Sequence, residues 1–260
     1  MDLPTSVILL LAAAGLAFAQ DLSRARLVDL SHAYDASTLF WPTEKDFQLD
    51  KLADGVTDQG YYYAANRFSS AEHGGTHMDA PLHFARGGHS VDQVPLSQLV
   101  GAAIVVDVSA RCAADRDYQV AVADFAAWEK AHGAIPAGAI VLLRTGFGKH
   151  WPDRLRYLGT AERGPAAVPK LHFPGLDPRA ARWLVDNRSI KSIGLDTASI
   201  DHGPSTLYES HRILFERNIP ALENLANLDQ LPATGATVIA LPMKIRGGSG
   251  APVRAIAVLP

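Results

Sequence analysis

Cysteine is nearly absent from this chain. Its 260 residues contain one, Cys112, which excludes a disulfide within the chain and any cysteine-rich zinc site. The polar stretch around it, SARCAADRD, predicts a thiol on the surface or in a loop. Basic clusters are missing too: 24 Lys and Arg residues are interspersed with 27 Asp and Glu residues. Without a basic patch or an aromatic RNA-binding motif, we expect no nucleic-acid partner.

Repeats, low-complexity tracts and Ser/Gly linkers are also lacking after residue 20. The composition, 48% hydrophobic and 20% charged, is that of an ordinary globular protein. A chain of this length can form one large domain or two small ones. With no boundary signal in the sequence, we predict one domain over residues 20–260.

The N-terminus differs in composition from the rest. Residues 5–19 form an apolar run that ends in Ala17-Phe18-Ala19, as in a secretory signal peptide with an A-x-A cleavage site. The run is too short for a transmembrane helix. Met1 to Pro4 lacks the usual basic residue, so an apolar helix that packs on the protein or a partner subunit is the alternative. Residues 1–19 are therefore predicted to direct export, to the periplasm or outside the cell, with a cytoplasmic location as the alternative.

Apolar spacing predicts alternating strands and helices, which indicates the α/β class. A helix start is marked by Asp177 as N-cap and Pro178 at the first helical position. Residues 31–70 are mixed, and 146–175 resemble a long irregular insertion. Strands are expected at 26–30, 102–108, 140–143, 192–195, 221–222, 236–245 and 253–259, and helices at 122–132, 178–185 and 206–217.

Three of the ten histidines lie within the twelve residues HGGTHMDAPLHF, at positions 73–84. The side chains His73, His77, Asp79 and His83 are four, two and four residues apart. Such even steps place side chains on one face of an extended strand. The step of four also suits one face of a helix, as in zinc-binding H-E-x-x-H segments.

The residues between these side chains decide against both regular forms. Gly74 and Gly75 cost about 1 kcal/mol each in a helix interior, and Pro81 costs about 3. A straight strand would hold His73 and His77 about 13 Å apart, too far for two imidazoles on one metal at ~2.1 Å. The segment must therefore bend, and the glycines supply the backbone freedom. We predict a curved, extended loop that points several ligands inward.

Two further candidate ligands lie in the second half of the chain. Glu223 is flanked by Ala221, Leu222 and Leu225, and a buried carboxylate needs a partner. A metal ion is one possibility, and Arg212 or Arg217 is another. His211 lies in a half-apolar segment, where the simplest interpretation is a core or helix-surface histidine.

These residues carry a family resemblance. HGGTHMDAPLHF matches the H-x-G-T-H-x-D-x-P-x-H signature of the metal-dependent cyclase family, which includes bacterial kynurenine formamidases and isatin hydrolases. Trp41-Pro42 and the segment GLDTASID at 194–201 are also similar to the family, as are the spacing of His211 and Glu223 and the C-terminal LPMKIRGGSGAPVRAIAVL. The resemblance covers roughly residues 27–259.

The resemblance implies a role for each matching residue. His73, His77 and Asp79 would bind a divalent metal, and His211 with Glu223 would complete the site or create a second metal position. His83 would donate and accept a proton, close to the metal. The implied fold is a swivelling β/α/β domain, with a mixed sheet and flanking helices, in a homodimer or larger homo-oligomer.

Elementary chemistry agrees with this assignment. Nitrogen and oxygen ligands suit Zn²⁺ or Mn²⁺, and such a cation polarises a carbonyl and lowers the pKa of bound water towards ~7. A histidine with an unperturbed pKa near ~6.5 can then take and return a proton. A purely structural metal site is the alternative, but such sites are usually closed by four ligands.

The predicted activity is hydrolysis of a C–N bond in a small cyclic or aryl amide. The export signal, the Tyr61–Tyr63 run and the 146–175 insertion argue for an isatin-like amide or lactone over N-formylkynurenine, whose degradation is cytosolic. An arylformamidase of tryptophan catabolism, or a non-catalytic periplasmic protein that binds a small molecule or metal, are the alternatives. Trp41 is predicted to stack on an aromatic substrate, with simple core packing as the alternative.

Overall fold

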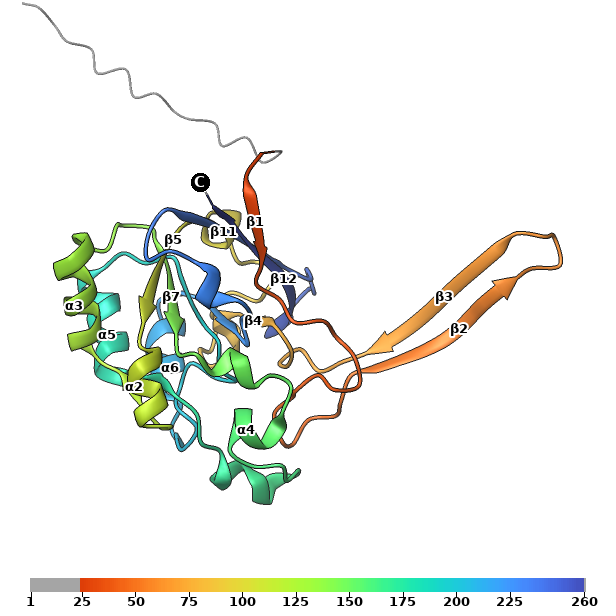
Figure 1. The fold of residues 1–260 in the computed structure, drawn as a ribbon, viewed down its shortest axis with the longest axis horizontal. Coiled ribbons are helices and arrows are strands. Elements are labelled where there is room, and N and C mark those ends of the chain that lie inside the picture. Colours follow the sequence, from red (N-terminus) through yellow and green to blue (C-terminus); the bar gives the residue numbers. More distant parts are fainter. Residues whose placement is uncertain (1–23, 260) are drawn as a thin grey trace, which may run out of the picture.

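An eight-stranded sheet organises the molecule. The computed structural model describes residues 24–259, and its main sheet has the order β1-β12-β11-β5-β7-β9-β10-β4 (Figure 1). Its strands are β1 Arg26–Asp29, β4 His77–Asp79, β5 Val100–Asp107, β7 Ile140–Arg144, β9 Ser192–Leu195, β10 Ala221–Glu223, β11 Ala236–Pro242 and β12 Gly250–Leu259.

The sheet closes on itself into a barrel-like arrangement. β12 pairs with β11 along one edge, and along the other it pairs with β1 and, nearer its start, with β4. Four neighbours, β5, β7, β9 and β10, run parallel, whereas all other pairs are antiparallel. Closure leaves fewer backbone groups unpaired at sheet edges. It also brings β4 and β10, from distant parts of the sequence, side by side.

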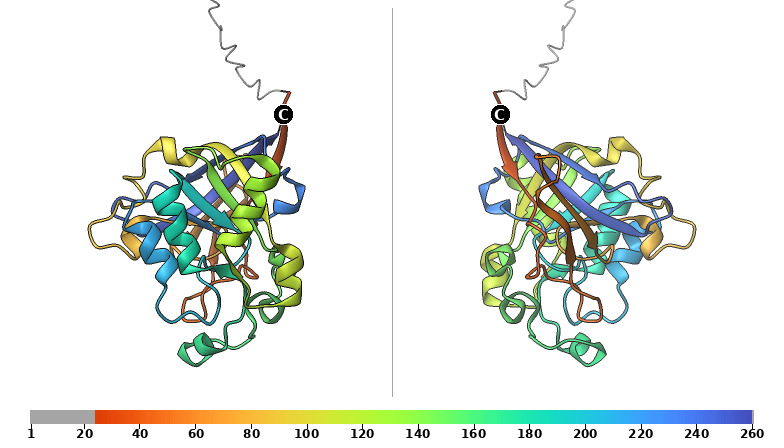
Figure 2. Two further views of the ribbon diagram at one scale, coloured as in Figure 1. Left: turned by 90° about the vertical axis from the view of Figure 1, so that its left-hand side faces the viewer. Right: turned by 90° about the vertical axis from the view of Figure 1, so that its right-hand side faces the viewer.

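Helices α3 Val122–His132, α5 Pro178–Asn187 and α6 Glu209–Phe215 cover one side of the barrel (Figure 2). The other helices are α1 Leu96–Leu99, α2 Ser109–Ala114 and α4 Arg154–Leu158, and the 3-10 turns are η1 Pro81–His83, η2 Phe147–His150, η3 Pro165–Lys170 and η4 Leu228–Gln230. Figure 2 shows the helices α3, α5 and α6 on one side of the strands and the strands β1 and β12 at the front of the opposite view. The N-cap predicted for α5 is present, because the Asp177 carboxylate accepts from the Arg179 amide at 2.7 Å.

The parallel strands are buried on both faces. In β5, Ile104 and Val106 pack towards the helices, whereas Ala103 and Val105 point into the barrel interior. β7 alternates in the same way. This is why these strands are nearly continuous hydrophobic runs in the sequence, as buried parallel strands usually are.

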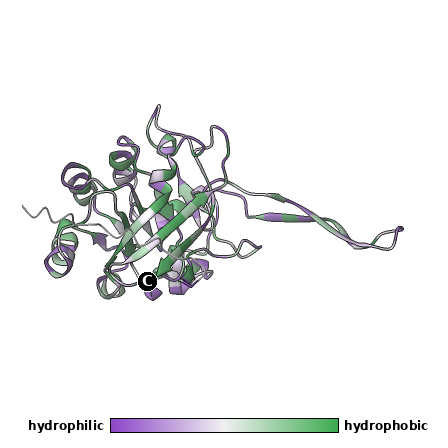
Figure 3. Ribbon diagram, turned by 90° about the horizontal axis from the view of Figure 1, so that it is seen from above, coloured by the Kyte–Doolittle hydropathy of each residue, from purple (hydrophilic) through white to green (hydrophobic). Residues whose placement is uncertain are grey.

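A two-stranded hairpin projects from the body on the side away from the helices (Figures 1 and 3). It consists of β2 Gln48–Val56 and β3 Tyr62–Ser69, and the sequence patterns had indicated only a mixed stretch over 31–70. A second small pair joins β6 Gln119–Val120 to β8 Gly175–Leu176. The 146–175 stretch, expected to be irregular, contains α4 and two 3-10 turns.

Cys112 departs from its prediction. It lies in α2 with only 2% of its surface exposed, because this short helix turns Cys112 towards the core between the sheet and the helices. The polar neighbours that suggested a loop occupy the other sides of the helix. Among residues 24–259, no helix is long and apolar enough to cross a membrane. The predicted signal peptide, 1–19, falls outside the described residues.

Candidate metal centre and active site

The histidine-rich motif bends at its glycines, as its composition predicted. Gly74 forms an isolated bridge with Phe40, and a Cβ at this position would lie 2.0 Å from the Phe40 ring. Gly75 follows with φ +57°, a conformation that favours glycine. After this turn the chain enters the short strand β4 and then the 3-10 turn η1. The bend allows His73 to fold back towards the residues of β4.

Strand pairing brings Glu223 to the motif. In the antiparallel register of β4 and β10, Glu223 lies opposite His77, and Ala221 lies opposite Asp79. His77 Nε2 is 3.0 Å from Asp79 Oδ1 and 3.5 Å from Glu223 Oε2. All three side chains are buried. A carboxylate flanked by apolar neighbours in the sequence is thus explained by its partners across the sheet.

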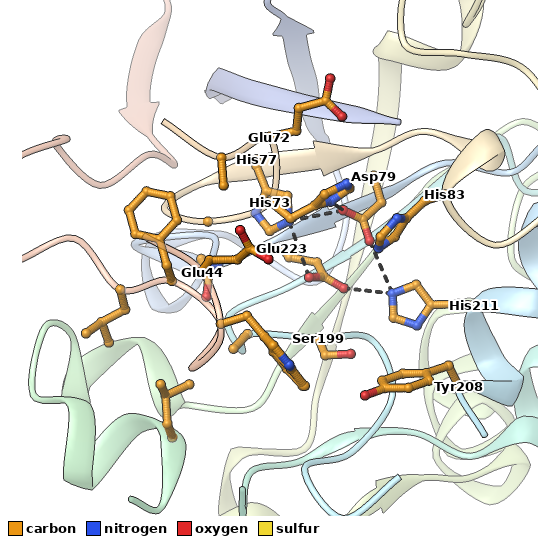
Figure 4. Close-up of a pocket in the computed structure, with 18 of the residues that line it drawn as sticks. Glu44, Glu72, His73, His77, Asp79, His83, Ser199, Tyr208, His211 and Glu223 are labelled. Carbon is orange, nitrogen blue, oxygen red and sulfur yellow. Dashed lines mark hydrogen bonds and ion pairs between the residues drawn. The ribbon is translucent and has the colours of Figure 1, made fainter. Parts of the chain in front are cut away.

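Helix α6 supplies His211, and the motif itself supplies His73. His211 Nε2 lies 3.2 Å from Asp79 Oδ2 and 3.1 Å from Glu223 Oε1. His73 Nδ1 lies 2.7 Å from Asp79 Oδ1. Figure 4 shows these five side chains converging on one point from β4, β10, α6 and the motif's first turn. The structure therefore brings together all five residues predicted as metal ligands.

The other ring nitrogen of His73, Nε2, has a hydrogen-bond partner, which determines where this ring carries its proton. His73 Nε2 lies 2.9 Å from Ser249 Oγ, and Ser249 Oγ donates to Glu72 Oε2 at 2.6 Å. Because the hydroxyl proton is used in that bond, Ser249 accepts from a protonated His73 Nε2. His73 Nδ1 is then the nitrogen that faces Asp79, and loss of its proton would free a lone pair that can bind a cation.

His77 and His211 are oriented the opposite way. His77 Nδ1 donates to the Gly75 carbonyl at 3.0 Å, and His211 Nδ1 lies 2.6 Å from the Asp201 carboxylate. In both rings Nε2 is left facing the cluster. Pairing of the outer nitrogen with a carboxylate or carbonyl is the usual support for metal-binding histidines.

The ionisable groups Asp79, Glu223 and His211 are buried, so their charges depend on one another and not on water. Burial opposes ionisation of Asp79, but the charge of His73 and hydrogen bonds from His211, His73 and His77 outweigh it and hold the Asp79 pKa well below its usual range. Burial and the charge of Asp79 raise the pKa of Glu223. Burial opposes protonation of His211, but Asp201, Asp79 and Glu223 together raise its pKa well above the ordinary value. Two carboxylates this close need positive charge between them.

His83 stacks on His73, with ring centroids 3.8 Å apart and an angle of 18° between the rings. Its side chain opens onto the cavity, yet the surrounding protein still removes much of its water. This desolvation, followed by the charges of His73, His211 and His77, lowers the His83 pKa to about 4, against the opposing effect of Asp79. The predicted proton-transfer residue thus lies beside the five candidate metal ligands (His73, His77, Asp79, His211 and Glu223, called here the metal-ligand cluster), with one ring face against His73.

A cavity of about 510 Å³ ends on this cluster. Its wall includes Trp41, which lies edge-on to Tyr208 and to Phe173 with ring centroids 6.4 Å away in each case. Trp41 is therefore half-buried and lines the cavity at the same time. The side chains that line the cavity, all within residues 24–259, include no lysine or arginine; they are Leu39, Phe40, Trp41, Glu44, Ala71, Glu72, His73, Gly74, His77, Asp79, His83, Phe84, Leu158, Ala198, Ser199, Tyr208, His211, Glu223 and Asn224.

The donor set fits a divalent cation. Two groups of side chains each have their ligand atoms within 4.8 Å of one another. One group is His73, Asp79 and His83, and the other is His77, Asp79 and Glu223. Asp79 belongs to both groups. Nitrogen and oxygen donors without sulfur suit borderline and hard cations, and the oriented imidazoles meet the requirement that ligand lone pairs face inward.

The arginines considered as partners of Glu223 play no such part. Its carboxylate accepts from the Ile200 amide at 2.8 Å and faces His77 and His211. No ion pair between Glu223 and Arg212 or Arg217 exists in the described part of the chain.

Several supporting residues escaped prediction. Asn224 has φ +54° and donates to the Gly75 carbonyl at 2.7 Å, and it accepts from the Tyr157 hydroxyl at 2.8 Å. Asp201, which holds His211, was part of the quoted 194–201 segment but received no role. Only the polar character of Asp201 within a family segment pointed to it, and nothing in the local sequence singled out Asn224 or Tyr157.

Comparison with known proteins places the chain in a family. The profile described as "Putative cyclase" matches residues 28–202, and the chain belongs to this cyclase family. An isatin hydrolase of Roseibium aggregatum is 35% identical over 221 residues, which cover 82% of this chain and 81% of that protein. A kynurenine formamidase of Salinibacter ruber is 32% identical over 234 residues, which cover 88% of this chain and 96% of that protein.

Solved structures of isatin hydrolases also share the fold of this chain. Isatin hydrolase A from Ralstonia solanacearum superimposes with a TM-score of 0.82 at 35% identity, and the match covers all of both chains. An isatin hydrolase bound to the product analogue thioisatinate gives a TM-score of 0.81 at 32% identity, covering 92% of this chain and 94% of that one.

Proposed function

We propose that this chain is a metal-dependent hydrolase that opens the C–N bond of neutral cyclic aryl amides of the isatin type. One observation carries the proposal. An aromatic-walled cavity without lysine or arginine ends on a cluster of three histidines and two carboxylates. The relatives of this chain include an isatin hydrolase and a kynurenine formamidase, which both hydrolyse C–N bonds outside peptides.

Zn²⁺ or Mn²⁺, at one or two ions per chain, is the proposed cofactor. His73, His77, Asp79, His211 and Glu223 would hold it, and it supplies Lewis-acid chemistry, polarising a carbonyl and activating water. Elemental analysis of protein purified without chelator tests this part. Absence of both metals from active protein would contradict it.

The chain's own residues handle the substrate and the proton. The walls formed by Trp41, Phe84 and Tyr208 suit a flat aromatic ring, which exclusion of water would hold against the cluster. Hydrolysis adds water across the C–N bond: the carbonyl carbon gains an oxygen and the nitrogen gains a proton. His83 is the residue placed to deliver that proton to the leaving nitrogen.

The charge of the cavity favours an isatin-like substrate over N-formylkynurenine. N-Formylkynurenine carries an α-ammonium and an α-carboxylate, and the buried carboxylate would require a cationic partner. Outside the histidine cluster the lining offers none, because it contains no lysine or arginine and because Glu44 and Glu72 could pair only with the ammonium. A neutral lactam carries no such group. The cavity therefore supports the choice that the sequence suggested on other grounds.

Turnover assays test the activity directly. We expect metal-loaded protein to hydrolyse isatin, with N-formylkynurenine and simple aryl amides poorer substrates. Tight binding of these compounds without turnover would instead support the alternative, a non-catalytic binding protein. Faster hydrolysis of N-formylkynurenine than of isatin would favour an arylformamidase.

Replacement of His83 separates its two possible roles. His83→Ala should lower turnover by about 10²–10⁴-fold, as expected for loss of an acid–base group, while metal content is kept. Loss of metal together with activity would make His83 a ligand, and another residue would then have to move the proton.

Export and assembly complete the proposal. The apolar run at 5–19 and its A-x-A end support secretion to the periplasm or beyond, and N-terminal sequencing of exported protein should begin near Gln20. An intact Met1 on cytosolic protein would contradict this. We infer also that the chain acts as a homo-oligomer, which the exposed apolar surface of β2 and β3 supports.

A further inference from the structure

Glycine and serine make up the segment GGSG at 247–250, called here the glycine turn. Glycine-rich segments are usually flexible, but this one is fixed on two sides. The Gly247 amide donates to the Asp92 carboxylate at 2.9 Å, and the Ser249 carbonyl accepts from the Ala80 amide at 2.8 Å. The glycine turn is therefore an ordered part of the barrel, directly before β12.

The glycines allow this turn to lie against the first residues of the histidine motif. A Cβ on Gly248 would lie 2.8 Å from Glu72 Oε1, and a Cβ on Gly250 would lie 2.6 Å from His73 Cε1. Gly250 also pairs with Asp79 in the register of β12 and β4. Such close approach of a backbone is a usual reason for glycine in a strand or turn. The glycine turn is thus fitted to Glu72 and His73.

A chain of hydrogen bonds runs through the turn from Glu72 to His73. Glu72 Oε2 accepts from the Ser249 amide at 2.9 Å and from the Ser249 hydroxyl at 2.6 Å. The same hydroxyl oxygen lies 2.9 Å from His73 Nε2. Because its proton points to Glu72, the Ser249 oxygen offers the ring only lone pairs, and Nε2 must donate. The other nitrogen, Nδ1, lies 2.7 Å from Asp79 Oδ1.

His73 is oriented differently from the other two histidines of the metal-ligand cluster. His77 and His211 turn Nε2 towards the cluster and bind a carbonyl or a carboxylate through Nδ1, whereas His73 turns Nδ1 towards it. An imidazole can present either nitrogen after a half-turn of its ring, and the partner of the outer nitrogen decides which one faces a metal. For His73 that partner is Ser249, held by Glu72.

The orientation of His73 also affects His83. The two rings stack with centroids 3.8 Å apart and 18° between their planes. His83 lies at the end of η1 with its side chain open to the cavity, so the face of His73 is one of the surfaces that support it. A rotation of the His73 ring would remove this support from the proposed proton-transfer residue.

We propose that Glu72 and Ser249 are positioning residues of the metal centre. They hold His73 with Nδ1 towards Asp79, and through the stacked rings they hold His83 at the cavity. Both effects are indirect, because Glu72 and Ser249 act through His73. The proposal rests on the proposed metal-dependent function, and it assigns a role to the glycine turn, which brings the Ser249 hydroxyl between Glu72 and His73.

A purely structural role for Glu72 is the alternative, because its carboxylate also accepts from the Ser249 backbone amide. Two variants separate the roles. Ser249→Ala removes the hydroxyl but keeps the amide, so the turn stays attached to Glu72 while His73 loses its partner. Ser249→Thr keeps a hydroxyl on the same backbone and serves as the rescue.

Titration of the metal-free full chain with Zn²⁺, in competition with a chromophoric chelator, is the first measurement. Ser249→Ala and Glu72→Ala should each lower zinc affinity by about 10–100-fold, the usual effect of losing the partner of a metal-binding histidine. Ser249→Thr should stay near the wild type. The control Asp92→Ala loosens the glycine turn from its other side and should lower Tm with zinc affinity kept. Far-UV circular dichroism checks that each variant is folded.

Nuclear magnetic resonance of the zinc-loaded protein, labelled with ¹⁵N in histidine, reports which nitrogen of each ring carries the proton. The His73 signals are those that a His73→Gln variant lacks. In the wild type, the His73 ring should carry its proton on Nε2. Ser249→Ala should change this pattern, and Asp92→Ala should preserve it, because a structural contact alone would not select one nitrogen.

Kinetics with isatin test the effect on His83. At saturating zinc, Ser249→Ala should lower kcat by about tenfold, because the proton donor is misplaced, while KM stays close to the wild-type value, because the cavity wall is unchanged. A rise in KM with unchanged kcat would instead mean that the turn contacts the substrate, contrary to the proposal.

Unchanged zinc affinity and an unchanged His73 signal in the folded Ser249→Ala variant would overturn the proposal. Equal losses in Ser249→Ala and Asp92→Ala would also overturn it, since the turn would then have only a structural role. Zinc affinity and the histidine signals require no substrate. A wild type that binds zinc but does not hydrolyse isatin would therefore contradict the proposed activity and leave this test intact.

Discussion

The metal-ligand cluster and the β2–β3 hairpin (residues 48–69, called the arm; Figures 1 and 3) both depart from the usual distribution of side chains. The cluster buries ionisable groups, whereas the arm exposes apolar ones. Around Asp79 and Glu223, ionisable groups are buried at 1% and 4% exposure. Along the arm, Val56 and Tyr62 leave most of their apolar surface in solvent. Each departure is costly in isolation, because buried charge requires compensation and exposed apolar surface favours association.

The two regions differ in where the compensation is found. Each buried group of the cluster has partners within the same chain, such as Asp201 on His211 and Ser249 on His73. The large apolar side chains of the arm are mostly exposed, and among the described residues only Phe68 stacks on another ring, that of Phe47, at 6.0 Å. The buried polar groups are therefore balanced by partners inside the chain, together with the proposed cation. The exposed apolar groups of the arm have no comparable balance within the described residues.

The largest effect is expected from removal of a ligand. His77→Ala leaves Asp79 and Glu223 buried without one of their positive partners, so metal content and turnover should fall together, with activity reduced by more than ~10³-fold. Elemental analysis and isatin hydrolysis measure the two losses. His132→Ala, at an exposed position on α3, is the control and should change neither. Unchanged metal content in the folded His77 variant would remove it from the ligand set.

A smaller effect should follow from loss of a supporting carboxylate. Asp201→Asn keeps the size of the side chain but weakens the hold on His211 Nδ1, so metal affinity should drop by about 10–100-fold, measured by titration against a chelator. Asp117→Asn is a matched control, because Asp117 makes the same type of contact, at 2.7 Å, with the exposed His172. Equal metal affinity in both variants would show that Asp201 has no orienting role.

Trp41 tests whether the cavity wall selects aromatic substrates. If its ring stacks on the substrate, the contact is worth about 0.5–1.5 kcal/mol, and Trp41→Ala should raise KM for isatin by about 2- to 12-fold with a Tm near wild type. Trp128→Ala provides the contrast, since Trp128 is a buried core residue. It should lower Tm by several degrees and leave the KM of the folded fraction unchanged. A Trp41 variant that behaves like the Trp128 variant would make Trp41 a core residue.

The smallest effect is expected at Cys112, a buried group that has no role in the site. Burial raises the pKa of its thiol to about 12, so at pH 8 the group is protonated and shielded. A thiol reagent such as dithionitrobenzoate should not label the native protein within minutes, and it should label one thiol per chain in denaturant. Rapid labelling of the native protein would show that α2 opens readily.

Strands and helices with strong periodic patterns were predictable. The helix 122–132 and the strand 192–195 have the predicted limits, because each carries its own propensity and end signals. The arm was not predictable, because its apolar residues face solvent and their spacing follows neither the pattern of a buried strand nor that of an amphipathic helix. β4, three residues long, depends on pairing with β10 and β12 and has no local signal.

The sequence by itself determined the chemistry of the site: the even spacing in HGGTHMDAPLHF, the bend at Gly74 and Gly75, and the supply of nitrogen and oxygen ligands without sulfur. Those features follow from residue types and backbone freedom within one segment. Only the tertiary structure decided which ligand atoms meet. Closure of the sheet places Glu223 opposite His77, and the docking of α6 brings His211 to Asp79 across 132 positions of sequence. Such contacts depend on the packing of the whole barrel, which no local pattern encodes.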